Sequence, residues 1–204
     1  MKKEVNMEPI LNSFKDKKGY IIFSILLFTA GAAIGYFAFK QDPEFILSNL
    51  NNLMGNIINI GKQIMGKKKL YAIGLIFQNN VKALLLMMFG GIFFGIIPLI
   101  GMIFNGLLIG IMLAMVFYEG KTLAFFLATL LPHGILELPV IILGASFGLK
   151  TGFEVIIPSK KQNRMENLKE NLTKSVLSMG ILVPLLYIAA VIETLITPYF
   201  AKLF

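Results

Sequence analysis

Residues 83–118 read ALLLMMFGGIFFGIIPLIGMIFNGLLIGIMLAMVFY, a run of 36 residues without a charged side chain. A helix crosses a hydrocarbon core of about 30 Å with roughly 20 residues, so this run is too long for one crossing. Pro98 lies near its middle, and proline interrupts helices. The run therefore predicts two antiparallel apolar helices joined near Pro98, in a hairpin that either spans the membrane or re-enters it.

The composition of the whole chain agrees with this prediction. Of the 204 residues, 56% are apolar and 15% are charged, whereas ordinary soluble domains carry about 25% charged residues. A soluble domain of this length cannot bury so much apolar surface in one core, but a bilayer solvates it. We expect an all-α fold, a polytopic transmembrane helical bundle that forms a single domain over residues 1–204 and lies in the cell membrane.

Outward from the central run, the hydropathy pattern predicts about five crossings. Helices are expected to be interrupted near Pro98 and at Pro132-His133-Gly134. The expected segments are, in order, a basic tail (1–19), a first span (20–39), an amphipathic interfacial helix (44–66), core spans with the Pro98 hairpin (70–149), a basic cytoplasmic loop (150–175) and a last span (176–200).

Two of these segments carry patterns of their own. In 44–66, apolar residues recur at helical spacing among asparagines, which is typical of a helix lying at the membrane interface. The first span contains Gly31-x-x-x-Gly35, a spacing that lets two helices approach closely. This pattern fits either a homo-oligomer contact or a packing face inside one bundle.

The net charge of +8 comes from basic residues that flank the apolar stretches. No nucleic-acid motif accompanies them, so we expect the bilayer rather than nucleic acid as the partner of this charge. Basic loops favour the cytoplasmic side, and five crossings place the tail and 150–175 together there, with a cytoplasmic N-terminus. The segment 40–82 then lies outside the cell although it carries five Lys before Asn79, which conflicts with the cytoplasmic preference of basic loops.

Ionisable residues inside apolar spans are costly and require an explanation. His133 is the only histidine and precedes Glu137 by four residues, so both project from one face of a helix. The pair fits a structural polar knot, a path for protons or ions in which Glu193 takes part, or a metal site. It is a weak metal candidate, because such sites need three or four ligands. We expect no cofactor.

Further polar residues lie next to these spans. Asn79 and Asn80 precede the central run, Asn105 lies inside it, and such amides cap helices or form hydrogen bonds between them. Lys82 either pairs with one of the carboxylates or extends to the interface. Motifs for nucleophilic or phosphate chemistry are absent from the sequence, and so is cysteine. These observations favour a protein without catalytic residues over an enzyme.

Taken together, these motifs resemble those of the stage II sporulation protein M family of polytopic membrane proteins. The matching residues are Ile76-Phe77-Gln78-Asn79-Asn80, Gly90, Gly95, Pro98, Asn105-Gly106, Leu131-Pro132-His133-Gly134-Ile135-x-Glu137-Leu138-Pro139 and Ile188-Ala189-Ala190-x-Ile192-Glu193. The resemblance implies a non-enzymatic scaffold or anchor for a membrane-associated complex, with protein partners that include a peptidoglycan-degrading enzyme in the namesake. The alternative is a transporter or channel that uses His133, Glu137 and Glu193.

Overall fold

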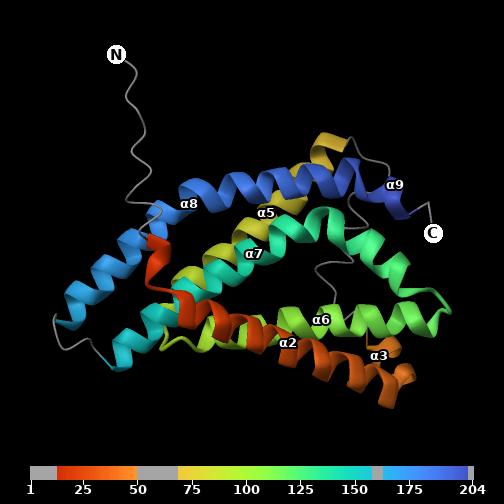
Figure 1. The fold of residues 1–204 in the computed structure, drawn as a ribbon, viewed down its shortest axis with the longest axis horizontal. Coiled ribbons are helices and arrows are strands. Elements are labelled where there is room, and N and C mark those ends of the chain that lie inside the picture. The colour runs from red at the N-terminus through yellow and green to blue at the C-terminus, as the bar shows by residue number, and fades with distance from the viewer. Residues whose placement is uncertain (1–12, 50–68, 158–162, 202–204) are drawn as a thin grey trace.

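The computed structural model describes residues 13–49, 69–157 and 163–201 (Figure 1). Within these ranges the regular structure is entirely helical. The elements are α2 (Lys18–Gln41), α3 (Pro43–Ser48), α5 (Lys69–Phe89), the 3₁₀ helix η1 (Gly90–Ile92), α6 (Ile96–Tyr118), α7 (Leu123–Ile156), α8 (Arg164–Leu195) and α9 (Thr197–Ala201).

Five of the described helices are long and apolar enough to cross a membrane. The spans are Lys18–Gln41, Lys69–Ile92, Ile96–Tyr118, Gly134–Ile156 and Arg164–Phe200. The predicted all-α fold with five crossings is therefore confirmed. The start of α2, the end of α7 and the start of α8 lie at one end of the bundle, here named the α7–α8 end (Figure 1).

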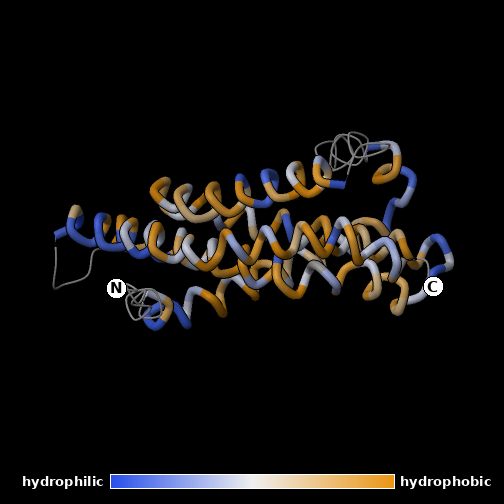
Figure 2. Tube along the Cα trace, turned by 90° about the horizontal axis from the view of Figure 1, so that it is seen from above, coloured by the Kyte–Doolittle hydropathy of each residue, from blue (hydrophilic) through white to orange (hydrophobic). Residues whose placement is uncertain are grey.

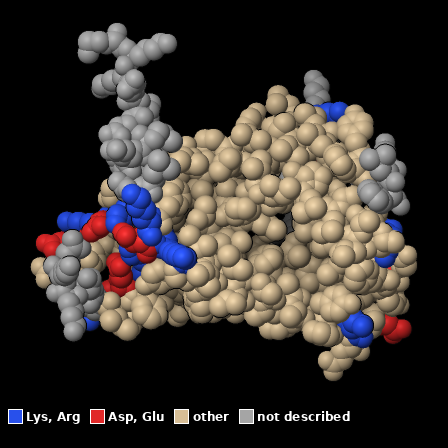
Figure 3. All heavy atoms as spheres, viewed as in Figure 1, with Lys and Arg blue, Asp and Glu red and all other residues tan. Residues whose placement is uncertain are grey.

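The surface of the bundle is polar at its two ends and apolar in its middle, except on α5, where Gln78, Asn79 and Lys82 are exposed within the span. Lys, Arg, Asp and Glu gather at the ends in the face shown in Figure 3, and the area between them carries none. In Figure 2 the most hydrophilic colours also lie mainly near the two ends. Large apolar side chains such as Leu26 and Phe37 are 60% and 66% exposed. This surface is typical of a protein surrounded by lipid.

Helices α2 and α6 pack against each other through small residues. A Cβ on Gly31 would lie 2.1 Å from the carbonyl oxygen of Ile103, and a Cβ on Gly106 would lie 2.0 Å from that of Phe28. Both distances are far shorter than a van der Waals contact, so only glycine permits this approach. The Gly31-x-x-x-Gly35 pattern therefore packs inside the bundle against α6.

The apolar core lies where α5, α6, α7 and α8 meet. Its central side chains, Leu84, Met88, Met102, Ala145 and Leu186, are all 0% exposed. Each belongs to a helix whose opposite face is directed outward and carries exposed apolar residues. The core is thus a seam of tight packing inside a bundle whose outer surface is also apolar.

The interruption expected near Pro98 lies a few residues earlier. The chain turns at Phe93, Phe94 and Gly95, with φ of 55° at Phe94 and 74° at Gly95. Pro98 lies in the first turn of α6, where its missing N–H has no partner in any helix. Near Pro132 the helix α7 continues but bends, and Figure 1 shows its first part turning away from its second.

Several boundaries differ from the expected ones. α5 begins at Lys69, so Asn79, Asn80 and Lys82 lie inside a span instead of before it. We expected a loop over 150–175, whereas most of its described residues are helical, because α7 and α8 extend past the apolar band as a pair. Of the amphipathic helix expected over 44–66, α3 covers the start, and residues 50–66 lie outside the described residues.

Candidate functional site

Three side chains from different helices meet inside the bundle: Asn80 of α5, Glu137 of α7 and Glu193 of α8. The side-chain amide of Asn80 interacts with the carboxyl group of Glu137. The carboxyl groups of Glu137 and Glu193 are close enough for their charges to interact. We name these three residues the inner polar group. Two acidic side chains here are costly unless protons, amides or cations compensate their charge.

Asn80 is the most enclosed member of the inner polar group. Its side chain is 6% exposed, and its amide nitrogen Nδ2 has no hydrogen-bond partner within the described part of the chain. Its oxygen Oδ1 accepts a long hydrogen bond of 3.5 Å from Nδ2 of Asn79. The amide of Asn80 thus interacts with the Glu137 carboxyl group without a hydrogen bond of ordinary geometry to it.

A small pocket reaches Glu137 from the side of α2 and α6. Its volume is about 130 Å³, and Asn105, Gly134 and Glu137 line it together with apolar residues. Nδ2 of Asn105 donates a hydrogen bond of 2.8 Å to the carbonyl oxygen of Gly101, one turn earlier in α6. Asn105 therefore orients its amide toward its own helix while facing the same pocket as Glu137.

The other residues predicted for the site, Asn79, Lys82 and His133, are not part of the inner polar group in the described structure. Asn79 and Lys82 are exposed on α5, and Lys82 forms no ion pair with either carboxylate among the residues described. His133 lies within α7, but its side chain is outside the described part of the structure. In the part of the chain that is described, no three His, Asp or Glu side chains gather as a metal site requires.

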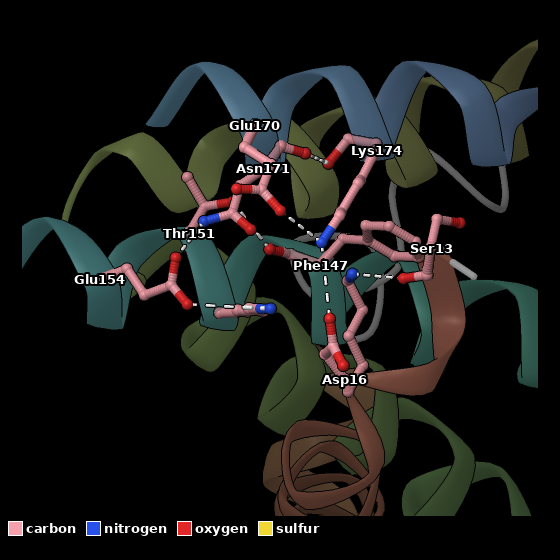
Figure 4. A network of polar contacts seen from close by, with 11 residues as sticks. Ser13, Asp16, Phe147, Thr151, Glu154, Glu170, Asn171 and Lys174 are labelled. Carbon is pink, nitrogen blue, oxygen red and sulfur yellow. Dashed lines mark hydrogen bonds and ion pairs between the residues drawn. The ribbon is translucent and has the colours of Figure 1, made fainter. Parts of the chain in front are cut away.

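A second polar cluster, not anticipated from the sequence, lies at the α7–α8 end (Figure 4). Nδ2 of Asn171 donates a hydrogen bond to Oε2 of Glu154, whose Oε1 lies 3.8 Å from Nζ of Lys150. Nζ of Lys174 lies 2.7 Å from Oε1 of Glu170 and 3.5 Å from Oδ2 of Asp16. We name this cluster the polar clasp; it comprises Ser13, Asp16, Lys17, Lys150, Glu154, Glu170, Asn171 and Lys174.

Lys17 anchors the segment before α2 to this clasp. Its Nζ donates a hydrogen bond of 2.5 Å to the carbonyl oxygen of Ser13 and lies 3.9 Å from the centroid of the Phe147 ring. The side chain is 1% exposed. Burial, together with the nearby charges of Lys150 and Lys174, lowers the pKa of Lys17 to about 8.

The clasp continues inward as a stripe of small polar side chains on α8. Asn167, Asn171, Ser175 and Ser178 face inward with exposures of 4%, 4%, 0% and 0%. The hydroxyl of Ser175 donates to the carbonyl oxygen of Asn171 at 2.9 Å, and that of Ser178 to Ser175 at 2.7 Å. The two hydroxyls are satisfied within their own helix and allow close packing, whereas Nδ2 of Asn167 is buried without a hydrogen-bond partner among the described residues.

This cluster left weak signals in the sequence. Lys150–Glu154 and Glu170–Lys174 are pairs at i,i+4 spacing, and Asn163 with Glu166 forms a capping box that starts α8. These local signals favour helices over residues 150–175, whereas the basic charge of this segment favoured a loop. The contacts among the segment before α2, the end of α7 and the start of α8 depend on the fold, and no local sequence pattern indicates them.

The arrangement of polar motifs on five apolar helices can be compared with known proteins. The sequence model of one family, stage II sporulation protein M, matches residues 24–198. The chain belongs to the stage II sporulation protein M family. An uncharacterized protein of Methanocaldococcus jannaschii is similar to this family member, with 30% identity over 185 residues that cover 89% of this chain and 95% of the relative. No solved structure matches the chain.

The range that matches the stage II sporulation protein M family contains most residues of both polar clusters. The matched range includes the inner polar group and, of the polar clasp, everything except Ser13, Asp16 and Lys17. The described structure accordingly presents a membrane protein of five apolar helices with two separate polar clusters.

Proposed function

We propose that this protein is a non-enzymatic membrane scaffold that anchors a complex at one face of the bilayer. The observation that supports this proposal is the polar clasp. It joins the segment before α2, the end of α7 and the start of α8, which are far apart in the sequence. The joined segments form a fixed, charged platform beyond the apolar band (Figures 1 and 4).

The outer face of this platform offers side chains to a partner. Arg164, Met165, Glu166 and Lys169 are exposed on the first turns of α8, with Met165 at 61%. An exposed apolar side chain among charges of both signs is suited to protein contacts with a polar rim. We therefore propose that protein partners bind at the start of α8.

The core between the two polar clusters supports a structural role for the inner polar group. Along α8, Leu182 and Leu186 separate Ser178 from Glu193, with 1% and 0% exposure. Along α5, Leu84 and Met88 follow Asn80 and are 0% exposed. A charged species passing between the clusters would have to cross this packed apolar layer, which is costly.

A cytoplasmic position of the platform is part of the proposal. The described basic residues at the α7–α8 end are Lys15, Lys17, Lys18, Lys150, Arg164, Lys169 and Lys174, those at the opposite end are Lys40, Lys69 and Lys121, and Lys82 lies between the ends on α5. Basic residues near span ends favour the cytoplasmic side. The N-terminus is then cytoplasmic and the C-terminus lies outside.

Site-specific photocrosslinking in membranes of the native host tests the scaffold. A photoreactive residue replaces Met165, and a matched control replaces Tyr118, which is 62% exposed at the opposite end. We expect a discrete crosslinked partner at position 165 that is absent at 118. The Lys169→Glu variant should weaken this crosslink, and Lys121→Glu should leave it unchanged. Crosslinks of equal pattern at both positions, or none at 165, would contradict the proposal.

A second candidate function is passage of a proton or small cation. The observation that favours it is the pocket of about 130 Å³ that reaches Glu137, whose carboxyl group also interacts with the buried Asn80. Acidic groups at an interrupted helix near the middle of a membrane are a known way to build substrate sites. Under this candidate, Glu137 binds the ion and the bend at Pro132 opens the path. Flux measurements distinguish the two candidates.

A further inference from the structure

A hollow of about 530 Å³ opens at the α7–α8 end, between the start of α2, the start of α6 and the end of α7. Its volume lies within the range of about 300–1,000 Å³ that is usual for small-molecule sites. The lining is almost wholly apolar and includes Gly19, Tyr20, Phe23, Leu99, Leu149 and Phe153. The rings of Tyr20 and Phe153 meet edge to face, with centroids 6.3 Å apart.

Two features of the backbone create this hollow. Gly19 has no atom within 4 Å of the place where a Cβ would stand, so its lack of a side chain leaves open space. Phe94 takes a φ of 55°, which places a bulky residue in the left-handed region, and its 60% exposed side chain lines the hollow. Bulky residues adopt this conformation only when their surroundings impose it, and such strain concentrates at binding sites.

The charges around the hollow favour a negative partner. Asp16 lines it, but Lys174 lies 3.5 Å from its carboxylate and compensates its charge. Lys15 and Lys18 are exposed and adjoin the lining residues Asp16 and Gly19 in sequence. Long Lys side chains extend along apolar surface toward the headgroup region. Among the described residues, Asp16 is the one charged residue of the lining, and the charged residues next to it in space or sequence, Lys174, Lys15 and Lys18, are basic.

We propose that this hollow binds a hydrocarbon chain of an anionic membrane lipid, with Lys15 and Lys18 binding the phosphate of its headgroup. The hollow lies at the level where the apolar band meets the charged end of the bundle, so a lipid can place its chain inside and its headgroup outside at once. A bound lipid would fill the space between α2, α6 and α7 and hold the platform against the membrane surface. Neutral lipids fit the apolar part but leave the two Lys without a partner.

Native mass spectrometry of the purified protein tests the site, with phosphatidylglycerol as the anionic probe and phosphatidylcholine as the neutral one. Gly19→Leu adds an apolar side chain at the lining of the hollow, where its Cβ meets no atom within 4 Å. Gly74→Leu is the matched control, because Gly74 also has nothing within 4 Å of its Cβ position. We expect wild type and Gly74→Leu to retain phosphatidylglycerol equally and Gly19→Leu to lose it. Equal retention by all three proteins would overturn the site.

The headgroup part has its own test. A Lys near an anionic surface contributes about 1 kcal/mol, which is about fivefold in affinity. Lys15→Gln and Lys18→Gln should each lower phosphatidylglycerol retention by about fivefold and leave phosphatidylcholine unchanged, whereas Lys121→Gln at the opposite end should change neither. Equal retention of the two lipids by wild type, or protection of the hollow by a second copy or another protein instead of lipid, would overturn the proposal.

Discussion

Gly106 of α6 lies so close to Phe28 of α2 that a Cβ on the glycine would stand 2.0 Å from the phenylalanine carbonyl oxygen. Gly106→Ala must therefore push the two helices apart, and overpacking of this kind costs about 1–3 kcal/mol. We expect the free energy of unfolding in detergent to fall by that amount, measured by circular dichroism during denaturation. Gly74→Ala, whose added methyl group meets open space, should be neutral or stabilising by up to about 1 kcal/mol. Equal effects of the two substitutions would contradict the packing.

The stability of the polar clasp should depend on pH through Lys17. Burial and the charges of Lys150 and Lys174 lower its pKa from the ordinary 10.5 to about 8. Between these two values the unfolded chain binds more protons at this position than the folded protein does, so stability rises with pH through this window. The gain by pH 10 relative to pH 7 should be about 1–3 kcal/mol.

Substitution of Lys17 isolates this effect from other titrations. Lys17→Met should flatten the rise in unfolding free energy between pH 8 and 10, whereas Lys18→Met, at an exposed neighbour, should retain it. Asp16 and Glu154 also face Lys17, and both variants keep them. Parallel curves for wild type and Lys17→Met would show that Lys17 is not buried as a cation.

The sidedness of the platform can be measured directly because the chain has no cysteine. Met165→Cys at the start of α8 and Lys121→Cys at the opposite end are both exposed positions. In inverted membrane vesicles a membrane-impermeant maleimide should label Cys at 165 and spare Cys at 121. The reverse pattern would place the platform and the N-terminus outside.

Much of the fold followed from apolar runs and prolines alone. The run over 83–118 is long, uncharged and interrupted, and it does form two helices. The start of α5 was placed too late because Gln78, Asn79, Asn80 and Lys82 interrupt its apolar sequence. The start of α8 was missed because this helix begins with polar residues. In α8, the buried Asn171 donates a hydrogen bond to Glu154 of α7, and a hydropathy pattern shows this residue only as part of a polar segment.

The sequence indicated which polar residues belong to the candidate site, but it could not show which of them lie close together in the folded protein. Glu137 and Glu193 stand out because they are ionisable within apolar spans. Their proximity, and the choice of Asn80 over Asn79 as the inward-facing amide, depend on how α5 and α8 rotate against α7. The polar clasp depends on a contact between Asp16 and Lys174, 158 positions apart, which no local pattern specifies.

The inner polar group should behave as a coupled structural unit. A double-mutant cycle with Asn80→Leu and Glu137→Gln measures the interaction between the two side chains in unfolding free energy. Polar contacts between membrane helices average about 0.6 kcal/mol and reach about 1.7. We expect a coupling in this range between Asn80 and Glu137, and none between Asn79→Leu and Glu137→Gln, because Asn79 is exposed. Additive effects of the first pair would show that the two groups do not interact.

Flux through the purified protein tests the scaffold most directly. Wild type and Glu137→Gln are reconstituted in proteoliposomes that contain a pH-sensitive dye, and proton and Na⁺ gradients are imposed in turn. If Glu137 belongs to a structural group behind a closed apolar core, neither protein exceeds protein-free liposomes, and Glu137→Gln differs only in its stability. Flux in wild type that disappears in a folded Glu137→Gln protein would contradict the scaffold and establish passage through the inner polar group.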